Sequence, residues 1–472
     1  MIFTAPLYAS ERHCGYCKDT KTDFFALESQ ATTFKETSNT KTTPSKQSVT
    51  LGSSILEMTC QEYDELINCG FRRSGDFLYK PDLLRTCCRL YTIRTNNSYL
   101  QLNKKQRKSI NKFIKEICPD ESILDPIPKN TFNLNRLFEA QSKSTNFKMK
   151  FEPSKFSREK YQLYKKYQIN VHNDDPDEVS EVGFRRFLCD TPFPFEEING
   201  TKEEWDNLNI QNWFKDKTNK VKRIGPTHVC YYLNDKLIAI SILDFLPSGI
   251  SSIYFIWDTD YAHLSLGVIS SIYEILLCEK LGYRWYYLGY YVEDCDKMNY
   301  KANFGGEILD VCTETYYPLK DIRPFLKNGR LFVIGDENTK GELDCEVSGN
   351  VHSKALTDDD TNISETIYGR AETELESKKD EYILKKRYEI YSKGLGLYKI
   401  PNVMPGLVPL WKIKKWLDEK EISASYEQQL LLGGDDVIYE FGDLNAQGKS
   451  IIIDCIRVFG LERVKNSTIA LQ

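Results

Sequence analysis

Two pairs of cysteines are the residues whose type and spacing most directly suggest chemistry. Cys14 and Cys17 form the sequence "CGYC", and Cys87 and Cys88 are adjacent in "TCCRL". A Cys-x-x-Cys turn directs two sulfur atoms toward one metal ion, and a second pair supplies the other two ligands of a four-thiolate site. Such a site suits tetrahedral zinc or an iron–sulfur cluster, and the spacing does not distinguish them. The alternative is four unligated thiols, two of them buried.

A single carboxylate stands out in an otherwise apolar segment. Residues 268–281 carry apolar side chains in nearly every direction of a helical wheel, which predicts a buried helix. Glu274 lies in the middle of this helix, and a buried carboxylate is usually either paired or used in chemistry. We therefore interpret Glu274 as a candidate acid–base residue. The alternative is a glutamate on a narrow solvent-exposed stripe beside Ser270.

Two basic clusters are candidates for binding an anionic polymer. Segment 102–118 has the spacing of an amphipathic helix with one apolar and one basic face, and segment 155–167 interleaves lysines with aromatic residues. The formal net charge is −5, so a nucleic acid must be held by local clusters of this kind. A charged helix face that contacts only solvent is the alternative. The candidate phosphate contacts are Lys104, Lys105, Arg107, Lys108, Lys165 and Lys166.

The elements that must position these residues are visible as patterns of apolar side chains. Strand patterns in "THVCYYL", "KLIAISILDFL" and "ISSIYFIW" precede the apolar helix, which ends near Gly282, and a fourth strand, "RWYYLGYYV", follows it. Asn234-Asp235 predicts a hairpin turn between the first two strands, and residues 74–76 predict a turn upstream. Three strands, a helix and a returning strand indicate an α/β (α+β) fold with a mixed sheet.

The composition changes along the 472 residues and suggests four parts. We predict a cysteine-rich metal-binding domain at 1–150, an α/β domain that carries Glu274 at 151–334, an acidic mobile linker or insertion at 335–385, and a small closing subdomain at 386–472. Residues 30–54, rich in Ser, Thr and Lys, are expected to form a flexible loop inside the first domain.

The N-terminal residues and the fourteen cysteines indicate a compartment. The opening sequence has neither the basic region nor the apolar run of a signal peptide, and no apolar stretch is long enough to span a membrane. We therefore expect a cytoplasmic protein, also present in the nucleus, in which most cysteines are reduced or bound to metal.

Two separate blocks of the sequence resemble one family. In the first block, "CGYC" is followed by "GFRRSGDFLYKPD" and "CCRLYTIR", and the second block runs from "HVCYYLNDKLIAISILDFLPSG" to "DCDKMNYKANF". Together they resemble the arginyl-tRNA–protein transferases of the N-degron pathway, most closely a fungal member. The resemblance implies an acetyltransferase-like (GNAT-like) catalytic layer. It also implies a zinc or iron–sulfur site at the same four cysteines, with a structural or regulatory role rather than a catalytic one.

The implied reaction moves arginine from Arg-tRNA(Arg) to the α-amine of proteins that begin with Asp, Glu or oxidised Cys, and so marks them for ubiquitin-dependent degradation. The donor ester is already activated, so the reaction needs positioning and a base but no nucleotide cofactor beyond the aminoacyl-tRNA. The sequence "ISSIYE" resembles the start of the family's helix and implies that Glu274 orients or deprotonates the amine. The acidic acceptor side chain needs cationic groups, and the arginyl group needs an acidic slot. The candidates for these substrate contacts are Arg72, Arg73, His228, Asp258, Lys297, Tyr300 and Lys301.

Three other functions are alternatives. The strand order also fits an acyl-CoA-dependent N-acetyltransferase, although "AHLSLGVIS" offers one glycine where such enzymes have a glycine-rich pyrophosphate loop. A metal-stabilised adaptor would bind tRNA or acidic N-termini without catalysis. A transferase with a leucyl donor would be expected to act on basic N-termini. We expect the arginyltransferase to be a monomer that binds no membrane.

Overall fold

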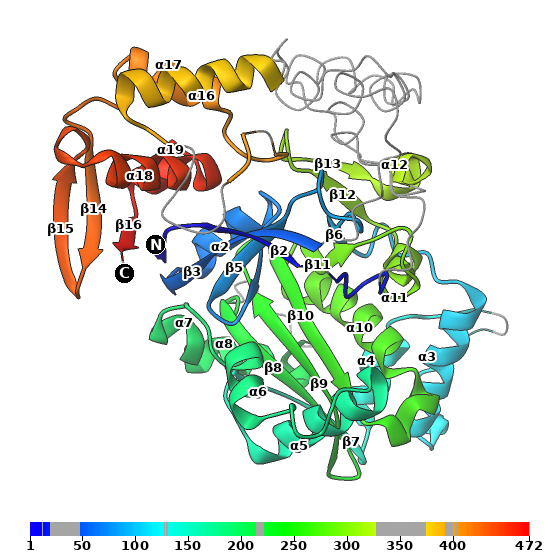
Figure 1. The fold of residues 1–472 in the computed structure, drawn as a ribbon. Helices are drawn as coiled ribbons and strands as arrows, with labels where there is room; N and C mark the ends of the chain where they lie inside the picture. The colour runs from blue at the N-terminus through cyan, green and yellow to red at the C-terminus, as the bar shows by residue number, and fades with distance from the viewer. Residues whose placement is uncertain are drawn as a thin grey trace.

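The computed structural model describes residues 1–11, 13–18, 48–126, 128, 131–213, 221–326, 374–391, 400–402 and 404–471. These residues form two eight-stranded sheets, both mixed, with helices packed around them (Figure 1). The α/β fold class predicted from the sequence is confirmed. Within these ranges no helix is both long enough and apolar enough to cross a membrane.

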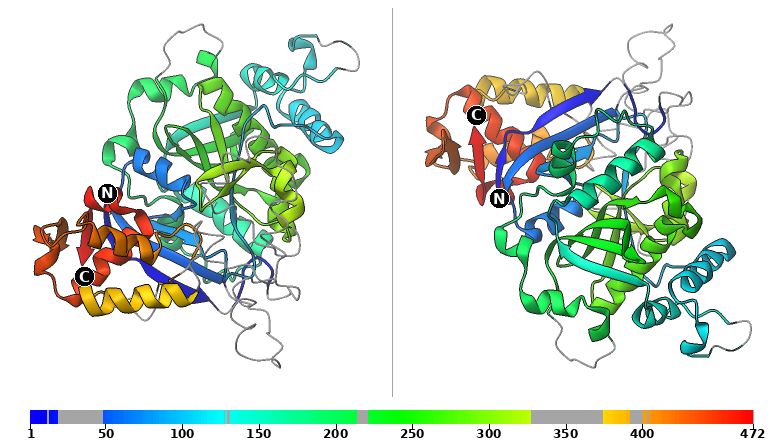
Figure 2. Two further views of the ribbon diagram at one scale, coloured as in Figure 1. Left: turned by 90° about the horizontal axis from the view of Figure 1, so that it is seen from above. Right: turned by 90° about the horizontal axis from the view of Figure 1, so that it is seen from below.

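The first sheet joins the two ends of the chain. β1 pairs in parallel with β16, so the N-terminal and C-terminal residues lie side by side (Figures 1 and 2). The C-terminal strands thus extend the N-terminal sheet. Its strands, in spatial order, are β15 (Asp435–Glu440), β14 (Glu427–Leu432), β16 (Thr468–Leu471), β1 (Ile2–Thr4), β3 (Ser48–Glu57), β5 (Phe77–Pro81) and β4 (Arg72–Ser74), and β2 (Leu7–Glu11) also pairs with β3.

The second sheet contains the predicted order of three strands, a helix and a returning strand. β8, β9 and β10 are antiparallel, α10 (Leu266–Leu281) follows them, and β11 returns parallel to β10. β6 comes from the N-terminal part of the chain and pairs with both β11 and β12. The spatial order is β13 (Thr315–Pro318), β12 (Glu307–Asp310), β6 (Tyr91–Thr95), β11 (Trp285–Tyr291), β10 (Gly249–Trp257), β9 (Lys236–Phe245), β8 (Gly225–Leu233) and β7 (Phe147–Pro153).

The local sequence explains where these elements end. Asn234 and Asp235 have φ values of 51° and 60°, the left-handed conformations of a two-residue hairpin turn, and they connect β8 to β9. Gly75, with a φ of 61°, lies in the turn between β4 and β5. α10 ends at Gly282, whose φ of 80° is readily adopted by glycine at a helix C-terminus. The three predicted ends are confirmed.

α10 is buried on nearly all sides, as its sequence predicts. It packs against β10 and β11 on one side and contacts α3 (Lys104–Ile117) on the other. Tyr273 also packs edge-to-face on Phe138 of α4 (Arg136–Lys143), with ring centroids 4.9 Å apart. The helix therefore carries Glu274 into the interior of the protein.

The remaining helices cover the faces and ends of the two sheets (Figures 1 and 2). Most are short, and one of them, η2, is a π-helical turn. They are α2 (Cys60–Ile67), η1 (Glu121–Ile123), α5 (Arg158–Tyr167), η2 (Gln168–His172), α6 (Glu181–Leu188), α7 (Phe195–Asn199), α8 (Lys202–Asn207), α9 (Ile210–Trp213), η3 (Thr259–Leu264), α11 (Asp296–Asn299), η4 (Tyr300–Phe304), α12 (Leu319–Leu326), α16 (Glu374–Tyr388), α17 (Leu410–Asp418), η7 (Phe441–Asp443), α18 (Ala446–Phe459) and α19 (Leu461–Lys465).

The loop predicted at 30–54 is partly a strand. Residues 48–54 belong to β3, which pairs with β1 and β2 on one side and with β5 on the other. The polar composition misled the prediction because buried hydroxyls here are satisfied by the backbone: Ser53 Oγ donates to the Thr4 carbonyl over 2.7 Å. Residues 30–47 lie outside the described residues.

The four predicted parts divide the chain differently from the two sheets. β6 precedes residue 150 but joins the second sheet, and β14 to β16 follow residue 386 but join the first sheet. Most of the predicted linker at 335–385 lies outside the described residues, although 374–385 form the first part of α16. Composition does not reveal such pairing, because strand partners are chosen by contacts between distant segments.

Candidate active site and metal centre

A cavity of about 700 Å³ lies where the two sheets and the turn that carries Cys14 and Cys17 meet. Six of the eight residues predicted to bind or activate the acceptor line it, and they come from β4, α10, α11 and η4. Segments more than two hundred residues apart in the chain therefore face one space. The six residues are Arg72, Arg73, Glu274, Lys297, Tyr300 and Lys301.

Glu274 is the buried carboxylate of this cavity. Ser241 of β9 donates a hydrogen bond to its Oε1 atom over 2.5 Å, and Tyr286 of β11 donates to its Oε2 atom. Among the described residues no cation lies within ion-pair distance of this carboxylate. Its burial raises the pKa of Glu274 to about 7, despite the opposing effect of the hydrogen bonds. A carboxyl group with such a pKa can take up and release a proton near neutral pH.

The two adjacent arginines of β4 have different environments. Arg73 forms a buried bidentate ion pair with Asp244 of β9, with N–O distances of 2.7 and 2.6 Å. Its charge is therefore already neutralised. The Arg72 guanidinium donates to the backbone carbonyls of Phe71 and Gly289 and lies 5.2 Å from the centre of the Tyr290 ring. Its Nε atom is buried without a hydrogen-bond partner, and the described part of the chain places no carboxylate in ion-pair contact with it.

Lys301 lies on the same side of the cavity as a second buried cation. Its ammonium group donates to the Tyr290 carbonyl over 2.5 Å. Burial, with the nearby charge of Arg72 as a further cause, lowers the pKa of Lys301 to about 7. An anionic ligand would relieve this electrostatic cost. Lys297 and Tyr300 are exposed residues at the edge of the cavity.

The structure places His228 and Asp258 outside the lining of this cavity. His228 is a buried residue of β8, and its ring contacts Lys160 and Ser154 at 2.9 Å each. Burial, with the charge of Lys160, lowers the pKa of His228 to about 3, so its ring is neutral and structural. The carboxylate of Asp258 forms ion pairs with Lys166 and Lys236. The predicted substrate contact Asp258 and the predicted tRNA contact Lys166 therefore bind each other.

His172 also lines the cavity, although no pattern of residues predicted this. It belongs to the π-helical turn η2, and its Nε2 atom is 3.0 Å from the hydroxyl of Tyr254 on β10. Tyr254 also lines the cavity and donates to the side chain of Gln168 over 2.9 Å. A π-helical turn has no distinctive apolar spacing, so this placement depends on the tertiary structure.

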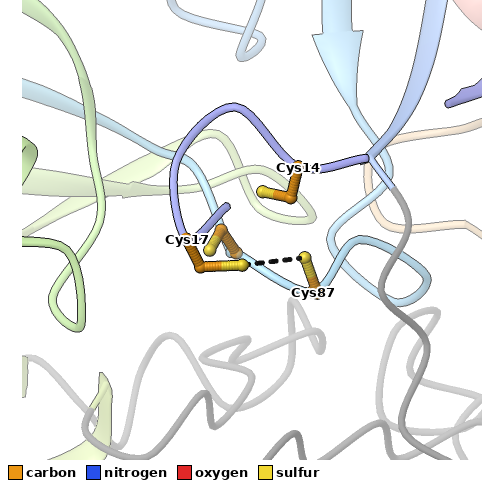
Figure 3. Close-up of side chains that lie close together, drawn as sticks. Cys14, Cys17 and Cys87 are labelled. Carbon is orange, nitrogen blue, oxygen red and sulfur yellow. Dashed lines mark hydrogen bonds between the residues drawn. The ribbon is translucent and has the colours of Figure 1, made fainter. Parts of the chain in front are cut away.

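The four predicted cysteines form one cluster. Cys14, Cys17, Cys87 and Cys88 have sulfur atoms that all lie within 4.8 Å of one another, and those of Cys17 and Cys87 are 3.8 Å apart (Figure 3). Zinc–sulfur bonds of about 2.3 Å in a tetrahedron place the sulfurs about 3.8 Å apart. The donor set therefore fits a metal ion, and the predicted association of the two pairs is confirmed. Hydrogen bonds from Cys87 and Cys88 hold the pKa of the Cys14 thiol well below its usual range, which favours a thiolate there.

The four-cysteine cluster lies beside the cavity. Gly15 and Tyr16, the two residues between Cys14 and Cys17, line the cavity. Cys295, which follows β11, donates from its sulfur to the Tyr16 carbonyl at 3.6 Å. The turn that carries two of the four cysteines therefore also shapes the space near Arg72.

α3 lies beside the cavity, but none of its basic residues lines it. Ser109 of α3 is 3.4 Å from Ser265, a cavity residue just before α10, and Gln106 donates to the Asn303 carbonyl over 3.3 Å. Lys165 is half-buried and belongs to α5, not to α3. The predicted helix is confirmed, and its exposed basic residues are Lys104, Lys105, Arg107, Lys108, Lys112 and Lys115.

Comparisons with known proteins agree with the geometry. A family model for the N terminus of arginine-tRNA-protein transferases matches residues 12–108, and one for the C terminus matches residues 159–310. Arginyl-tRNA–protein transferase 1 of Saccharomyces cerevisiae is 40% identical over 97% of this chain and 95% of its own length. Aspartate/glutamate leucyltransferase of Pseudomonas aeruginosa is 28% identical over 55% of this chain and 85% of its own length.

The name of the leucyltransferase joins a leucyl donor to acidic acceptors, which differs from the expectation that a leucyl donor acts on basic N-termini. Among solved structures, the C-terminal domain of a putative lysylphosphatidylglycerol synthetase from Agrobacterium fabrum covers 43% of this chain and 46% of its own, with 9% identity and a TM-score of 0.22. That likeness is too low to support an argument. The two family models occur in the expected order, and the yeast identity extends over nearly the whole chain, so this chain belongs to the arginyl-tRNA–protein transferase family.

Proposed function

We propose that the protein transfers arginine from Arg-tRNA(Arg) to the α-amine of proteins that begin with Asp, Glu or oxidised Cys, and so marks them for ubiquitin-dependent degradation. One observation supports this function above the others. Counting partners among the described residues, the same cavity contains a buried carboxylate without a cation, Glu274, and two buried cations without a carboxylate, Arg72 and Lys301. An acceptor with an α-amine and an acidic side chain complements both.

The acceptor enters with its acidic side chain toward Arg72 and Lys301. The carboxylate of the acceptor side chain supplies the negative charge that balances these two cations. It raises the pKa of Lys301 from about 7, so Lys301 keeps its ammonium form when the acceptor is bound. The α-amine then faces Glu274, and deprotonation allows it to attack the arginyl carbonyl carbon. The ribose hydroxyl of the tRNA leaves, and no covalent enzyme intermediate is required.

The tRNA approaches along α3. The exposed lysines of this helix supply phosphate contacts, and the hydrogen bond from Ser109 to Ser265 holds the helix beside the cavity. Replacing Lys104, Lys105 and Lys108 by glutamate should weaken tRNA binding and reduce its dependence on salt. A triple variant with the affinity and salt dependence of the wild type would exclude this surface.

Zinc is the metal that we propose for the four-cysteine cluster. A single ion suits sulfur atoms that lie within 4.8 Å of one another, whereas the cysteines of a four-iron cluster bind different irons and are held apart by the cluster. Metal analysis of protein purified without oxygen would test this, because one zinc without visible absorption is expected. Iron with sulfide in equal amounts would contradict it.

The compartment and the oligomeric state are further proposals. A site of four thiolates needs reduced cysteines, which supports the cytoplasm and the nucleus as working compartments. We propose that the protein acts as a monomer. Cell fractionation and light scattering would test these two statements.

A transfer assay tests the function directly. Wild-type protein should transfer arginine, but not leucine from Leu-tRNA or acetyl groups from acetyl-CoA, to peptides that begin with Asp or Glu and not to one that begins with Ala. The rate should rise with pH through about 7, because Glu274 must lose its proton to act as a base. Glu274→Gln should lower kcat by at least about 10²-fold and abolish this rise. Peptide and tRNA binding without any transfer by the metal-containing wild type would favour the adaptor.

A further inference from the structure

Two hydroxyl groups donate hydrogen bonds to the carboxylate of Glu274. Tyr286 of β11 lines the cavity and donates to the Oε2 atom. Glu274 also lines the cavity, and Ser241, which is not part of the lining, donates to the Oε1 atom. The hydroxyl of Tyr286 therefore connects the cavity with the carboxylate.

Tyr286 has an oxygen that is available to a substrate. A phenol oxygen carries one hydrogen and two lone pairs. Tyr286 uses its hydrogen for Glu274, so its lone pairs can accept a hydrogen bond from a group in the cavity that its side chain lines.

We propose that Tyr286 accepts the proton of the attacking amine and passes its own proton to Glu274. This inference depends on the function proposed above. The nitrogen forms a bond with the arginyl carbonyl carbon and loses a proton to the Tyr286 oxygen, while the Tyr286 proton moves to Oε2 of Glu274. When the ester C–O bond breaks, a proton returns along the same path to the ribose oxygen. An amide and a ribose hydroxyl are formed, and both side chains regain their starting protonation.

The electrostatics of the two groups suit a relay. Burial, followed by the negative charge of Glu274, raises the pKa of Tyr286 well above its usual range, so the phenol does not act as a phenolate base. Burial also brings the pKa of Glu274 to about 7, near the value of about 7.7 to 8.0 for an α-amine. A proton can therefore pass between the amine and Glu274 at a small cost in free energy.

Tyr286→Phe tests the relay because it removes the hydroxyl and keeps the ring. We expect the single-turnover rate of arginine transfer to an Asp-initiated peptide to fall by about 10²-fold, with the peptide Kd unchanged within about twofold. Tyr283→Phe is the matched control. Tyr283 is 4% exposed and Tyr286 2%, and the Tyr283 hydroxyl donates to the Arg223 carbonyl outside the cavity. This control should keep the wild-type rate.

The dependence of the rate on the deuterium content of the solvent separates a relay from a structural role. Two protons move together in the wild type, which should give a curved dependence, whereas Tyr286→Phe should give a linear one. A wild-type rate and a curved dependence in Tyr286→Phe would overturn the relay and leave arginine transfer intact. No transfer by the wild type would overturn the proposed function itself.

The wild-type measurement covers the case in which Tyr286→Phe does not fold. A linear dependence of the wild-type rate on the deuterium content of the solvent would contradict the relay, because only one proton would then move. Circular dichroism establishes whether each variant is folded.

Discussion

The four-cysteine cluster and the buried lining of the cavity (Arg72, Arg73, Glu274 and Lys301) both contain polar groups, but they differ in how the charges are balanced. At the centre, four sulfur atoms surround one point, and a metal ion would balance all of them at once. In the lining of the cavity, Glu274 has no cationic partner, and Arg72 and Lys301 have no carboxylate partner, among the described residues. In the same lining, Arg73 forms an ion pair with Asp244.

This difference separates residues that stabilise the fold from residues that can bind a substrate. Charges that are balanced within the protein stabilise the folded state, and their interactions change little when a ligand binds. An incomplete set costs free energy in the empty protein, and a ligand of complementary charge recovers that cost. We therefore expect variants at the metal centre and at Arg73 to act on stability, and variants at Arg72 and Glu274 to act on activity.

The largest effect is expected at the metal centre. Cys88→Ala removes one of the four proposed ligands, so we expect loss of the metal and a fall in unfolding free energy of several kcal/mol, seen as a drop in Tm of about 5 °C. Cys118→Ala is the control, because Cys118 is equally buried but outside the cluster, and it should cost about 1 kcal/mol. Equal drops in Tm for the two variants would show that the cluster has no special role in stability.

The next largest effect separates the two arginines. Asp244→Ala leaves Arg73 buried without its partner, so we expect a loss of about 3–5 kcal/mol in urea unfolding. Arg72→Met removes a cation that has no carboxylate partner in the described chain, so its stability should change by less than about 1 kcal/mol while the KM for an Asp peptide rises. If Arg72→Met loses as much unfolding free energy as Asp244→Ala, the proposed distinction between Arg73 as a structural residue and Arg72 as a substrate-binding residue is wrong.

The smallest effect is the dependence of stability on pH. Burial raises the pKa of Glu274 in the folded protein to about 7 from an ordinary value of 4.5. The folded state therefore binds this proton more tightly, and its contribution is complete below about pH 4.5 and is lost as the pH rises through 7. Between these limits the wild type should lose about 3 kcal/mol relative to Glu274→Gln. Parallel curves of unfolding free energy against pH for the two proteins would contradict the buried, unpaired carboxylate.

Periodic and local features were predictable from the sequence. The apolar residues of α10 predicted a helix buried on all sides, and the Asn234-Asp235 turn predicted the β8–β9 hairpin, because each signal involves neighbours within a few residues. The loop at 48–54 was predicted wrongly for a related reason. Its Ser and Thr residues have the composition of a loop, and only the strands on either side make them part of β3.

The sequence by itself determined which side chains are present and which of them are buried. Cys14 with Cys17 and Cys87 with Cys88 are recognisable as ligand pairs, because a metal requires two donors on each short turn, and Glu274 is recognisable because its helical neighbours are apolar. These predictions use only the chemistry and the local geometry of the chain.

The tertiary structure alone decided which charges are satisfied. Arg72 and Arg73 are indistinguishable in the sequence and both line the cavity, yet the position of β9 gives a carboxylate partner, Asp244, to Arg73. His228 and Asp258 bind partners on α5 and do not line the cavity, whereas His172 lines it from a π-helical turn. The physical reason is that charge compensation depends on distance in space, which a sequence of residues does not record.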